Sequence, residues 1–181
     1  MDNAKSILVA TNSQKVLEFF LDHPGRELTE KETQNSVKVS KSGTNYALRE
    51  LAKANFLLRD KKGKMSFYSL NYKNPAIKQL KVLKIIMFIQ PIIKKLAVSS
   101  SQITLFGSSA RGEDISDSDI DLFVISNSKK QELERVIEKI RLKRKIQLIV
   151  ETELFHTELK VKSPDFYEQV QRGIVLWRRE Q

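Results

Sequence analysis

The sequence predicts an α+β protein with an N-terminal helical segment that ends in a hairpin, a linker helix, and a C-terminal domain built on a small mixed sheet. Three observations lead to this prediction. Apolar residues recur at helical spacing through residues 5–54, a long apolar helix follows over 74–99, and short β-branched runs alternate with helical segments over 100–181. We therefore predict two domains, 1–73 and 100–181, joined by the helix at 74–99.

Composition limits the compartment and the class of protein. The chain has 181 residues and no cysteine, so disulfides and thiolate metal sites are excluded. This fits a reducing compartment, and we expect a cytoplasmic protein because no signal peptide pattern opens the sequence. The most apolar stretch, 82–98, is interrupted by lysines, a glutamine and a proline, which predicts a buried helix rather than a membrane span.

The net charge of +10 is distributed unevenly along the chain. Residues 1–73 carry 13 Lys and Arg against 8 Asp and Glu, and residues 74–100 carry 5 against none. Residues 101–181 carry 14 of each sign. The excess positive charge therefore lies in the front half, which indicates that this half meets a polyanion. The alternative is a basic, solvated surface without a partner.

Three helices are predicted in the N-terminal segment. The first covers 5–23, with a cap at Asn12 or Ser13. The second covers 29–37 and opens with a threonine followed three residues later by a glutamate, which is the capping-box pattern. The third covers 40–54 and opens with a serine cap. These caps divide the segment into short helices that can pack around one core.

The third helix is followed by a predicted hairpin. Its buried face is expected to consist of Tyr46, Ala47, Leu48 and Leu51. Asn55, which tolerates a left-handed conformation, should end the helix. Alternating residues then predict strands at 56–59 and 65–70, joined across the basic segment 60–64.

Three helices followed by a hairpin with a basic tip resemble the winged helix-turn-helix family, and residues 47–57, ALRELAKANFL, resemble its recognition helix and first wing strand. The resemblance implies that the helix from Ser40 lies in a DNA major groove and that the wing reaches phosphates. The implied DNA contacts are Lys41, Ser42, Thr44, Asn45 and Arg49 on the helix, and Lys61, Lys62 and Lys64 on the wing. Winged helices also serve as protein docking modules, so a role without DNA contact stays open.

The predicted linker helix starts at Asn74 and Pro75, which form a cap followed by proline at the first helical position. Pro91 should kink this helix. Because residues 82–98 are apolar on more than one face, we expect them to pack against the C-terminal domain and also against either the winged helix or a second copy of the chain. A homodimer is one of these alternatives.

The strongest functional pattern lies at residues 105–125, LFGSSARGEDISDSDIDLFVI. The apolar run 103–106 predicts a buried strand, which Gly107 ends. Ser108 and Ser109 follow where a short helix could start, so a hydroxyl and several unpaired backbone N–H groups would point out of the turn together. Such a corner suits an anion, and phosphate is the usual one.

Asp119 and Asp121 lie in the next alternating segment. Residues i and i+2 of a strand lie roughly 6.6 Å apart on one face, so both carboxylates can share divalent cations. Mg²⁺ prefers a few carboxylates together with phosphate oxygens and water. Two Mg²⁺ ions about 4 Å apart could then hold the attacking and leaving oxygens of a phosphoryl transfer.

This succession of strand, Gly-Ser pair and Asp-x-Asp strand resembles the nucleotidyltransferases of the DNA polymerase β superfamily, most of all the minimal nucleotidyltransferases. The end of the chain, residues 171–177, also resembles that branch. The resemblance implies that Gly107 and Ser108 hold the triphosphate of ATP or another NTP, and that Asp119 and Asp121 hold two Mg²⁺ ions. A nucleoside monophosphate would pass to a hydroxyl acceptor with release of pyrophosphate.

Further contacts and partners follow from the same resemblance. Ser109 and Arg111 are candidate nucleotide contacts, although Arg111 could equally pair with Asp119 or Asp121. The neighbouring acids Glu113, Asp114 and Asp117 are expected on a solvated loop. Minimal nucleotidyltransferases often act as antitoxins beside a small all-helical HEPN partner, so an antitoxin-like role with such a partner is implied.

After the Asp-x-Asp strand we predict further elements of the sheet and its covering helices. Ser128 should cap an amphipathic helix whose inner face ends near Ile140. A strand follows at 145–151, a last helix opens at 163–165, and a final segment runs over 174–177. This order of elements completes the small mixed sheet.

One position departs from the superfamily pattern. A third carboxylate is expected on strand 145–151, but alignment of that strand places Gln147 there, and a glutamine can neither neutralise charge nor act as a base. Glu151 lies roughly 13 Å further along the strand, so a register shift or bulge would be needed to bring it in. Two hypotheses stay open: an active nucleotidyltransferase, or a winged-helix regulator whose second domain binds nucleotide with little or no turnover.

Overall fold

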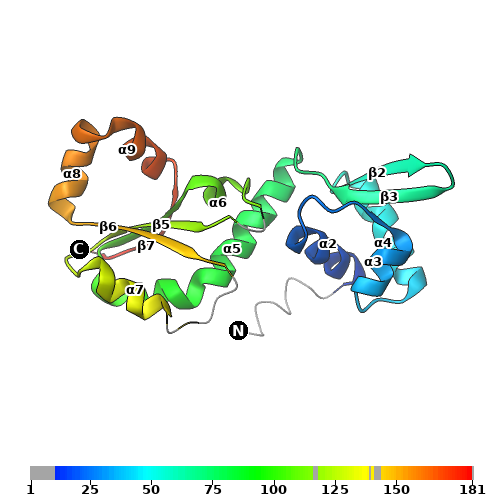
Figure 1. The fold of residues 1–181 in the computed structure, drawn as a ribbon, viewed down its shortest axis with the longest axis horizontal. Coiled ribbons are helices and arrows are strands. Elements are labelled where there is room, and N and C mark those ends of the chain that lie inside the picture. Colours follow the sequence, from blue (N-terminus) through cyan, green and yellow to red (C-terminus); the bar gives the residue numbers. More distant parts are fainter. Residues whose placement is uncertain (1–10, 116–117, 139, 141–143, 181) are drawn as a thin grey trace. The chain divides into compact units, whose positions relative to one another are not determined.

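The computed structural model describes residues 11–115, 118–138, 140 and 144–180. The chain divides into two compact units, Met1–Lys78 and Gln79–Gln181, and each has its own sheet (Figure 1). The two units are described separately below.

The N-terminal unit combines short helices with an antiparallel sheet. Its elements are α2 (Asn12–Asp22), β1 (Leu28–Thr29), α3 (Glu30–Ser36), α4 (Lys41–Lys53), β2 (Leu57–Lys62) and β3 (Met65–Leu70). The strand order is β1-β3-β2, and both pairings are antiparallel. The three helices and the hairpin predicted from the sequence are therefore present in the predicted order among the described residues, whereas residues 5–10 of the first predicted helix lie outside them.

Local hydrogen bonds explain where these helices begin. At α3, the capping box predicted at Thr29 is confirmed, because the Thr29 hydroxyl accepts from the Glu32 amide and the Glu32 carboxylate accepts from the Thr29 amide. At α4, the Ser40 hydroxyl accepts from the Gly43 amide, as predicted. At α2 the predicted cap, Asn12 or Ser13, is wrong. The capping residue is Thr11, which forms a capping box.

The end of α4 and the hairpin differ from expectation in detail. Asn55 has φ 60°, which confirms the left-handed stop. The strands extend further toward the tip than predicted, because Lys62 pairs with Met65 and the turn contains only Gly63 and Lys64. The prediction that Tyr46 faces inward is wrong, since its side chain is 64% exposed. The other three predicted inward residues of α4 are buried.

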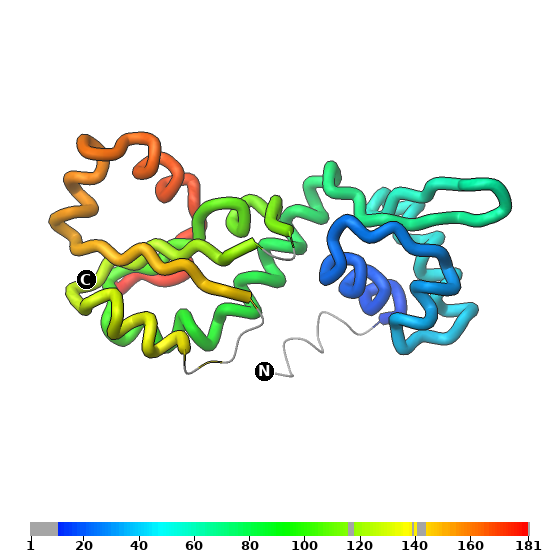
Figure 2. The backbone as a smooth tube through the Cα atoms, viewed as in Figure 1, coloured from blue at the N-terminus to red at the C-terminus, as the bar shows by residue number. Residues whose placement is uncertain are grey.

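The C-terminal unit is an α+β domain on a mixed sheet of order β6-β5-β4-β7. Its elements are most of α5 (Pro75–Leu96), a short 3-10 turn (Ala97–Ser99), β4 (Gln102–Phe106), α6 (Gly107–Arg111), β5 (Ile120–Ile125), α7 (Lys130–Glu138), β6 (Ile146–Glu151), α8 (Glu153–Lys162), α9 (Pro164–Gln171) and β7 (Ile174–Arg178). β5 and β6 run parallel and side by side, whereas β4 is antiparallel to both of its neighbours (Figure 2). The sequence did not predict α8.

Helices cover both faces of this sheet (Figure 1). Leu122 and Val124 pack with residues of α5 and α7 on one face, whereas Phe123 packs with Val170 of α9 on the other. Because side chains of a strand alternate between faces, Asp121 lies on the same face as Phe123. The Asp121 carboxylate therefore lies on the opposite face of the sheet from the core formed with α5 and α7.

α5 belongs mainly to the core of the C-terminal unit. Five of its apolar residues are buried there: Ile85, Ile89, Ile92, Ile93 and Leu96. Its start is as predicted, since the Asn74 side chain accepts from the Ala76 amide. The helix continues through Pro91 to Leu96. Within the described part of the chain, no helix combines the length and apolarity that a membrane span requires.

α7 begins later than the sequence indicated. It starts at Lys130, so Ser128 lies two residues before the first helical residue and is not its cap. The Ser128 amide instead donates to the Ser126 hydroxyl at 3.0 Å. Leu133 is buried and Val136, Ile137 and Ile140 pack against the same core, which confirms the predicted inner face.

Candidate active site

A glycine corner brings the end of β4 against the β5 carboxylate. Gly107 directly follows β4, has φ +69°, and is the first residue of α6. A Cβ atom at this position would collide with the carboxylate of Asp121. Both the left-handed conformation and the close approach therefore require glycine. Ser108 follows it and is half-buried.

Asp119 and Asp121 lie at the start of β5. Asp119 immediately precedes the strand, and Asp121 is its second residue. The register places Asp121 opposite Phe106 on β4 and opposite Gln147 on β6. The structure thus brings the glycine corner and the two predicted metal-binding aspartates to one end of the sheet.

The electrostatic environment of the two aspartates favours a cation. Burial raises the pKa of Asp121, and the nearby negative charge of Asp119 raises it further. The Lys145 ammonium lies 3.5 Å from a carboxylate oxygen of Asp119 and supplies one positive charge, although this lysine is 77% exposed. The ammonium is strongly solvated at that exposure, so it offsets the repulsion between the carboxylates only weakly.

β6 offers no third carboxylate beside Asp121. Its pairing with β5 is regular along the whole strand, with Gln147 opposite Asp121 and Glu151 opposite Ile125. The register shift that would move Glu151 into the site is therefore absent from this strand pair. Burial raises the pKa of Glu151 at its distant position. Within the described residues, His, Asp and Glu form no cluster of three or more that could hold a metal ion.

Two of the predicted nucleotide contacts have other partners. Ser109 is fully buried, and its hydroxyl donates to the Asp119 backbone carbonyl at 3.4 Å. The Ser109 side chain therefore holds the Asp119 backbone from inside the domain, and a nucleotide contact by Ser109 stays a prediction. Arg111 is exposed and pairs with Glu113 at 2.9 Å rather than with either aspartate.

The acidic loop after α6 is only partly solvated. Glu113 is exposed, as predicted, and Asp117 lies outside the described residues. The prediction that Asp114 is solvated is wrong, since its side chain is 6% exposed. Arg144 pairs with it at 2.8 Å and Lys81 at 3.3 Å. These two cations make burial of the carboxylate tolerable.

The raised pKa of Asp121 predicts a pH-dependent effect on stability. The folded state binds a proton at Asp121 more tightly than the unfolded state, whose value is 3.8. Ionisation therefore costs stability as pH rises from 3.8 through the folded-state pKa, and the cost persists at neutral pH. In EDTA at pH 7, Asp121→Asn should raise the melting temperature by about 1–3 °C.

The same variant should lose this advantage at low pH, where Asp121 of the wild-type protein is protonated. Thermal unfolding followed by circular dichroism at pH 7 and pH 3.5 measures the difference. A lower melting temperature for Asp121→Asn in EDTA at pH 7 would contradict the inferred repulsion.

The predicted DNA-binding residues of α4 are not all accessible. Lys41, Ser42 and Arg49 are exposed. Asn45 is half-buried, and its amide donates to Glu30 at 2.5 Å. The prediction that Thr44 is outermost is wrong, because this side chain is fully buried. Helical spacing explains the division, since Lys41, Asn45 and Arg49 repeat at four residues on one face, whereas Thr44 faces the core.

Tyr46, which was not predicted as a surface residue, is exposed. It lines an open hollow together with Lys41, Ser42, Asn45 and Arg49. The available signal was its position, because Tyr46 is four residues after Ser42 and three before Arg49. An exposed aromatic ring among cations and amides is a typical feature of a ligand-binding surface.

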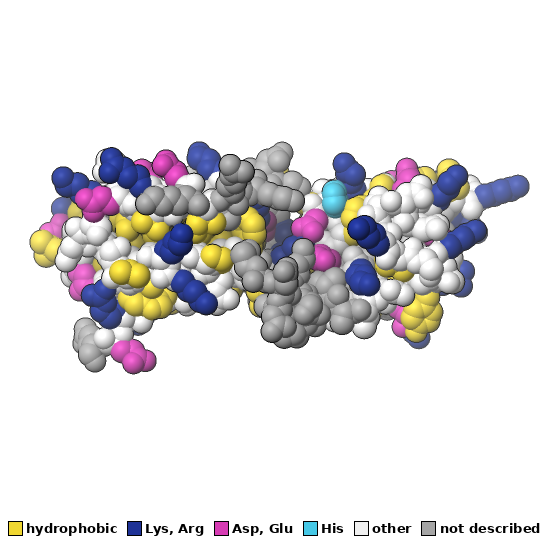
Figure 3. Space-filling model, turned by 90° about the horizontal axis from the view of Figure 1, so that it is seen from below, with side chains coloured by type: hydrophobic (Ala, Val, Ile, Leu, Met, Phe, Trp, Pro, Cys, Tyr) yellow, Lys and Arg dark blue, Asp and Glu magenta, His cyan; other side chains and the backbone are white. Residues whose placement is uncertain are grey.

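The three predicted lysines of the hairpin are exposed. Lys62 pairs with Glu27 at 2.5 Å and lies 3.8 Å from Asp60. Lys61 and Lys62 lie at the end of β2, and Lys64 lies in the hairpin turn that follows. On the face drawn in Figure 3, Lys and Arg side chains are spread over both units, so charge alone does not single out one binding surface.

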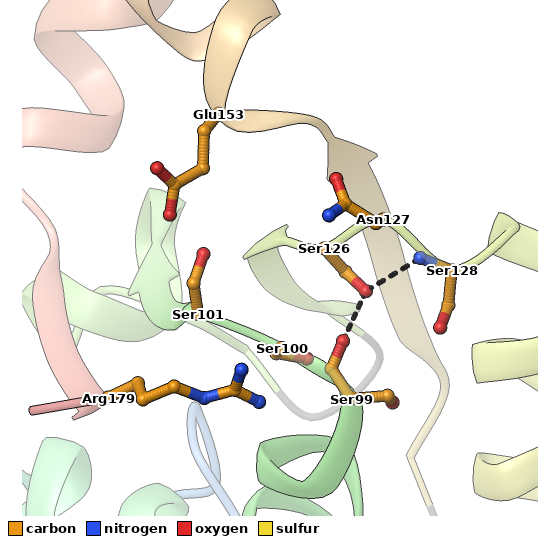
Figure 4. Close-up of a pocket in the computed structure, with 8 residues that line it drawn as sticks. All are labelled: Ser99, Ser100, Ser101, Ser126, Asn127, Ser128, Glu153 and Arg179. Carbon is orange, nitrogen blue, oxygen red and sulfur yellow. Dashed lines mark hydrogen bonds between the residues drawn. The ribbon is translucent and has the colours of Figure 1, made fainter. Parts of the chain in front are cut away.

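A polar pocket lies at the other end of the C-terminal sheet. It has a volume of about 450 Å³ and is lined by Ser99, Ser100, Ser101, Ser126, Asn127, Ser128, Glu153 and Arg179. Ser101 directly precedes β4 and Ser126 directly follows β5, whereas the glycine corner and Asp121 lie at the opposite ends of these strands. Ser126 links the rim by hydrogen bonds to Ser99 and Ser128 (Figure 4). This pocket is therefore separate from the aspartate pair.

The fold and the site together define a class of protein. The C-terminal unit combines a small mixed sheet with a glycine corner against one carboxylate and a second carboxylate two residues away. The family model described as "Nucleotidyltransferase domain" matches residues 77–175, which is more than half of the chain. The chain belongs to this nucleotidyltransferase domain family.

Two solved structures are similar over parts of their length. A proposed nucleotidyltransferase from Sulfolobus solfataricus is 18% identical with a TM-score of 0.38, and the match covers 58% of this chain and 90% of that one. TrmBL2, an archaeal chromatin protein, is 12% identical with a TM-score of 0.29, over 89% and 70% of the two chains. These scores are too low to carry a functional argument. No curated protein sequence matches the chain.

Proposed function

We propose that the C-terminal unit transfers a nucleoside monophosphate from ATP or another NTP to a hydroxyl acceptor, with Mg²⁺ as cofactor. The observation that carries the proposal is the approach of Gly107 to the Asp121 carboxylate, with Asp119 two residues away. Family membership supports nucleotidyl transfer in general. The acceptor and the base of the NTP are left open.

Different residues of the site would bind the phosphates and the metal ions. Backbone N–H groups of the glycine corner would bind the triphosphate beside the carboxylates, and Ser108 can donate its hydroxyl to a phosphate oxygen. Asp119 and Asp121 would hold Mg²⁺, because their oxygens are the ligands that this ion prefers and the raised pKa of Asp121 marks a site that a cation would stabilise. Bound Mg²⁺ would neutralise the phosphate charge that develops during transfer.

Position 147 limits the proton chemistry of the site. The Gln147 amide lies opposite Asp121 but cannot accept a proton from the acceptor hydroxyl. The acceptor molecule would therefore have to bring its own base or an already acidic hydroxyl. This observation favours a second candidate function, in which the domain binds a nucleotide with little turnover and reports it to the N-terminal unit.

One experiment separates the two functions. The purified full chain is incubated with Mg²⁺ and a cell lysate in the presence of ATP labelled either at the α-phosphate or at the γ-phosphate. Nucleotidyl transfer moves only the α-label to an acceptor. Transfer of the γ-label would instead indicate a kinase reaction, and nucleotide binding without transfer of either label would support the second candidate.

We also propose that the N-terminal unit binds duplex DNA through Lys41, Ser42 and Arg49 of α4 and through the hairpin lysines. The exposure of these three α4 residues on one hollow supports the proposal. Tyr46 joins the proposed surface because it lines the same hollow. Lys61 and Lys64 would contact phosphates, while the Glu27 partner of Lys62 reduces the charge that this lysine offers.

The DNA proposal predicts a salt-dependent loss of binding in defined variants. Arg49→Ala combined with Lys41→Ala should weaken duplex binding by at least about tenfold and lower the slope of log affinity against log salt by about one to two. Lys15→Ala, an exposed lysine on α2, is the matched control and should bind as the wild type. Fluorescence anisotropy at several salt concentrations measures both quantities. Equal effects of the control and the double variant would contradict the proposed surface.

Two partners are carried forward as proposals from the family resemblance. One is a small all-helical HEPN-type protein, to which this chain would act as an antitoxin, and the other is a second copy of the chain. Light scattering after size-exclusion chromatography tests the homodimer, and co-expression with a candidate HEPN protein tests the first partner.

A further inference from the structure

A buried ion cluster lies beside the loop that leads to Asp119. One oxygen of the Asp114 carboxylate is 2.8 Å from Nη1 of Arg144, and the other is 3.3 Å from Nζ of Lys81. Lys81 also donates a hydrogen bond to the Asp114 backbone carbonyl. The Lys81 and Asp114 side chains are about 5% and 6% exposed, and Arg144 is 20% exposed. The cluster joins α5, the loop after α6 and the residue two positions before β6.

Arg144 extends the cluster to the residue before Asp119. Its Nε and Nη2 atoms both donate to the Ser118 backbone carbonyl, at 3.1 and 2.7 Å. The next carbonyl, that of Asp119, accepts from the Ser109 hydroxyl, and the Ile120 amide donates to the Lys145 carbonyl at 3.0 Å. Backbone groups of three consecutive residues around Asp119 are therefore held from two different segments, α6 and residues 144–145.

The burial of three charged groups indicates that this cluster contributes something other than folding stability. Removing three charged groups from water is costly, and a buried ion pair is often no more stabilising than apolar residues of the same volume. What such a cluster supplies is a single geometry, because the planar guanidinium fork fixes both the carboxylate of Asp114 and the Ser118 carbonyl. The fixed geometry lies directly before a predicted metal ligand.

We propose that Arg144, held by Asp114 and Lys81, is a positioning residue that fixes the Asp119 carboxylate for metal binding. The inference rests on the proposed function, since it assumes that Asp119 binds Mg²⁺. It assigns a role to three residues outside the Gly-Ser and Asp-x-Asp pattern, and one of them comes from α5. Residues that orient a metal ligand typically change metal affinity by about 10–100-fold when replaced.

The test compares Mn²⁺ binding by the full-length protein and its variants, followed by electron paramagnetic resonance without nucleotide or acceptor. Arg144→Lys keeps the positive charge but loses the fork on Ser118, so it should weaken Mn²⁺ binding by about tenfold or more. In the transfer assay kcat should fall while KM for the nucleotide changes little. Arg172→Lys, which replaces a surface arginine paired with Glu168, is the matched control and should behave as the wild type.

Each outcome decides the proposal. Folded Arg144→Lys protein that binds Mn²⁺ within twofold of the wild type would overturn it. If Arg144→Lys does not fold, the double variant Lys81→Met and Asp114→Leu tests the proposal instead. It removes both partners of the Lys81–Asp114 ion pair together, so neither of these two charges is left buried alone. At least threefold weaker Mn²⁺ binding by that folded variant supports the proposal, and unchanged binding overturns it. Unchanged Mn²⁺ binding by Asp119→Ala would instead refute the metal site of the proposed function itself.

Discussion

Asp119→Asn and Asp121→Asn are each expected to reduce transfer of the α-label by at least about 1000-fold. Each change removes one of the two negative oxygen ligands that the site offers to Mg²⁺, and loss of several kcal/mol of charge stabilisation corresponds to a rate effect of this size. The Asn variants keep the shape and hydrogen-bonding capacity of the side chain, so the fold should be retained. Initial rates with α-labelled ATP and saturating Mg²⁺ measure the effect.

The matched control for these variants is Glu113→Gln. This change removes an exposed carboxylate of the loop between α6 and β5, and the carboxylate pairs with Arg111. It should change the transfer rate by less than about threefold. The stability measurement adds an internal check, because Asp121→Asn is expected to be inactive and yet more stable in EDTA. Substantial label transfer by either Asn variant would show that other residues carry the reaction.

Patterns that depend on neighbours in the sequence were predictable. The capping box at Thr29, the Asn55 stop and the alternation of β5 all rest on residues within four positions of one another. The placement of Gln147 at the site came from aligning its strand with the superfamily pattern, and the regular register of β5 and β6 agrees with it, since Gln147 lies opposite Asp121. These features include the glycine corner and both aspartates of the candidate site.

Features that depend on distant residues or on weak periodicity could not be predicted. α8 was missed because its apolar residues do not form one stripe: Leu159 is buried, whereas Leu154 and Val161 are 74% and 84% exposed. Asp114 was misplaced because its partners lie 33 and 30 positions away, at Lys81 and Arg144. No local pattern distinguishes an acid with such partners from a solvated one.

Because Gln147 leaves the site with two carboxylates, we expect the wild-type chain to bind one Mn²⁺ ion instead of the two that the resemblance implies, and Gln147→Glu to bind two. The variant is also expected to increase the transfer rate by about 100-fold or more. Gln147 lies opposite Asp121 on a parallel strand, so a carboxylate of nearly the same shape would face the same site. It would add the negative charge that a second ion needs and a base for the acceptor hydroxyl, for which about 100-fold is a modest contribution. Mn²⁺ titration and α-label transfer measure the two effects.

Two companion variants make this expectation decisive. Glu151→Gln should change neither quantity, because Glu151 lies opposite Ile125 at the far end of the strand pair. Gln147→Leu should leave transfer close to the wild-type rate if the amide takes no part in the reaction. Should Gln147→Glu bind a second ion without any gain in rate, the missing group would have to come from the acceptor, and the glutamine would then be a feature of acceptor specificity. Should it bind no second ion, the charge of Lys145 beside Asp119 would be the next group to remove, since it is the cation nearest that carboxylate among the described residues.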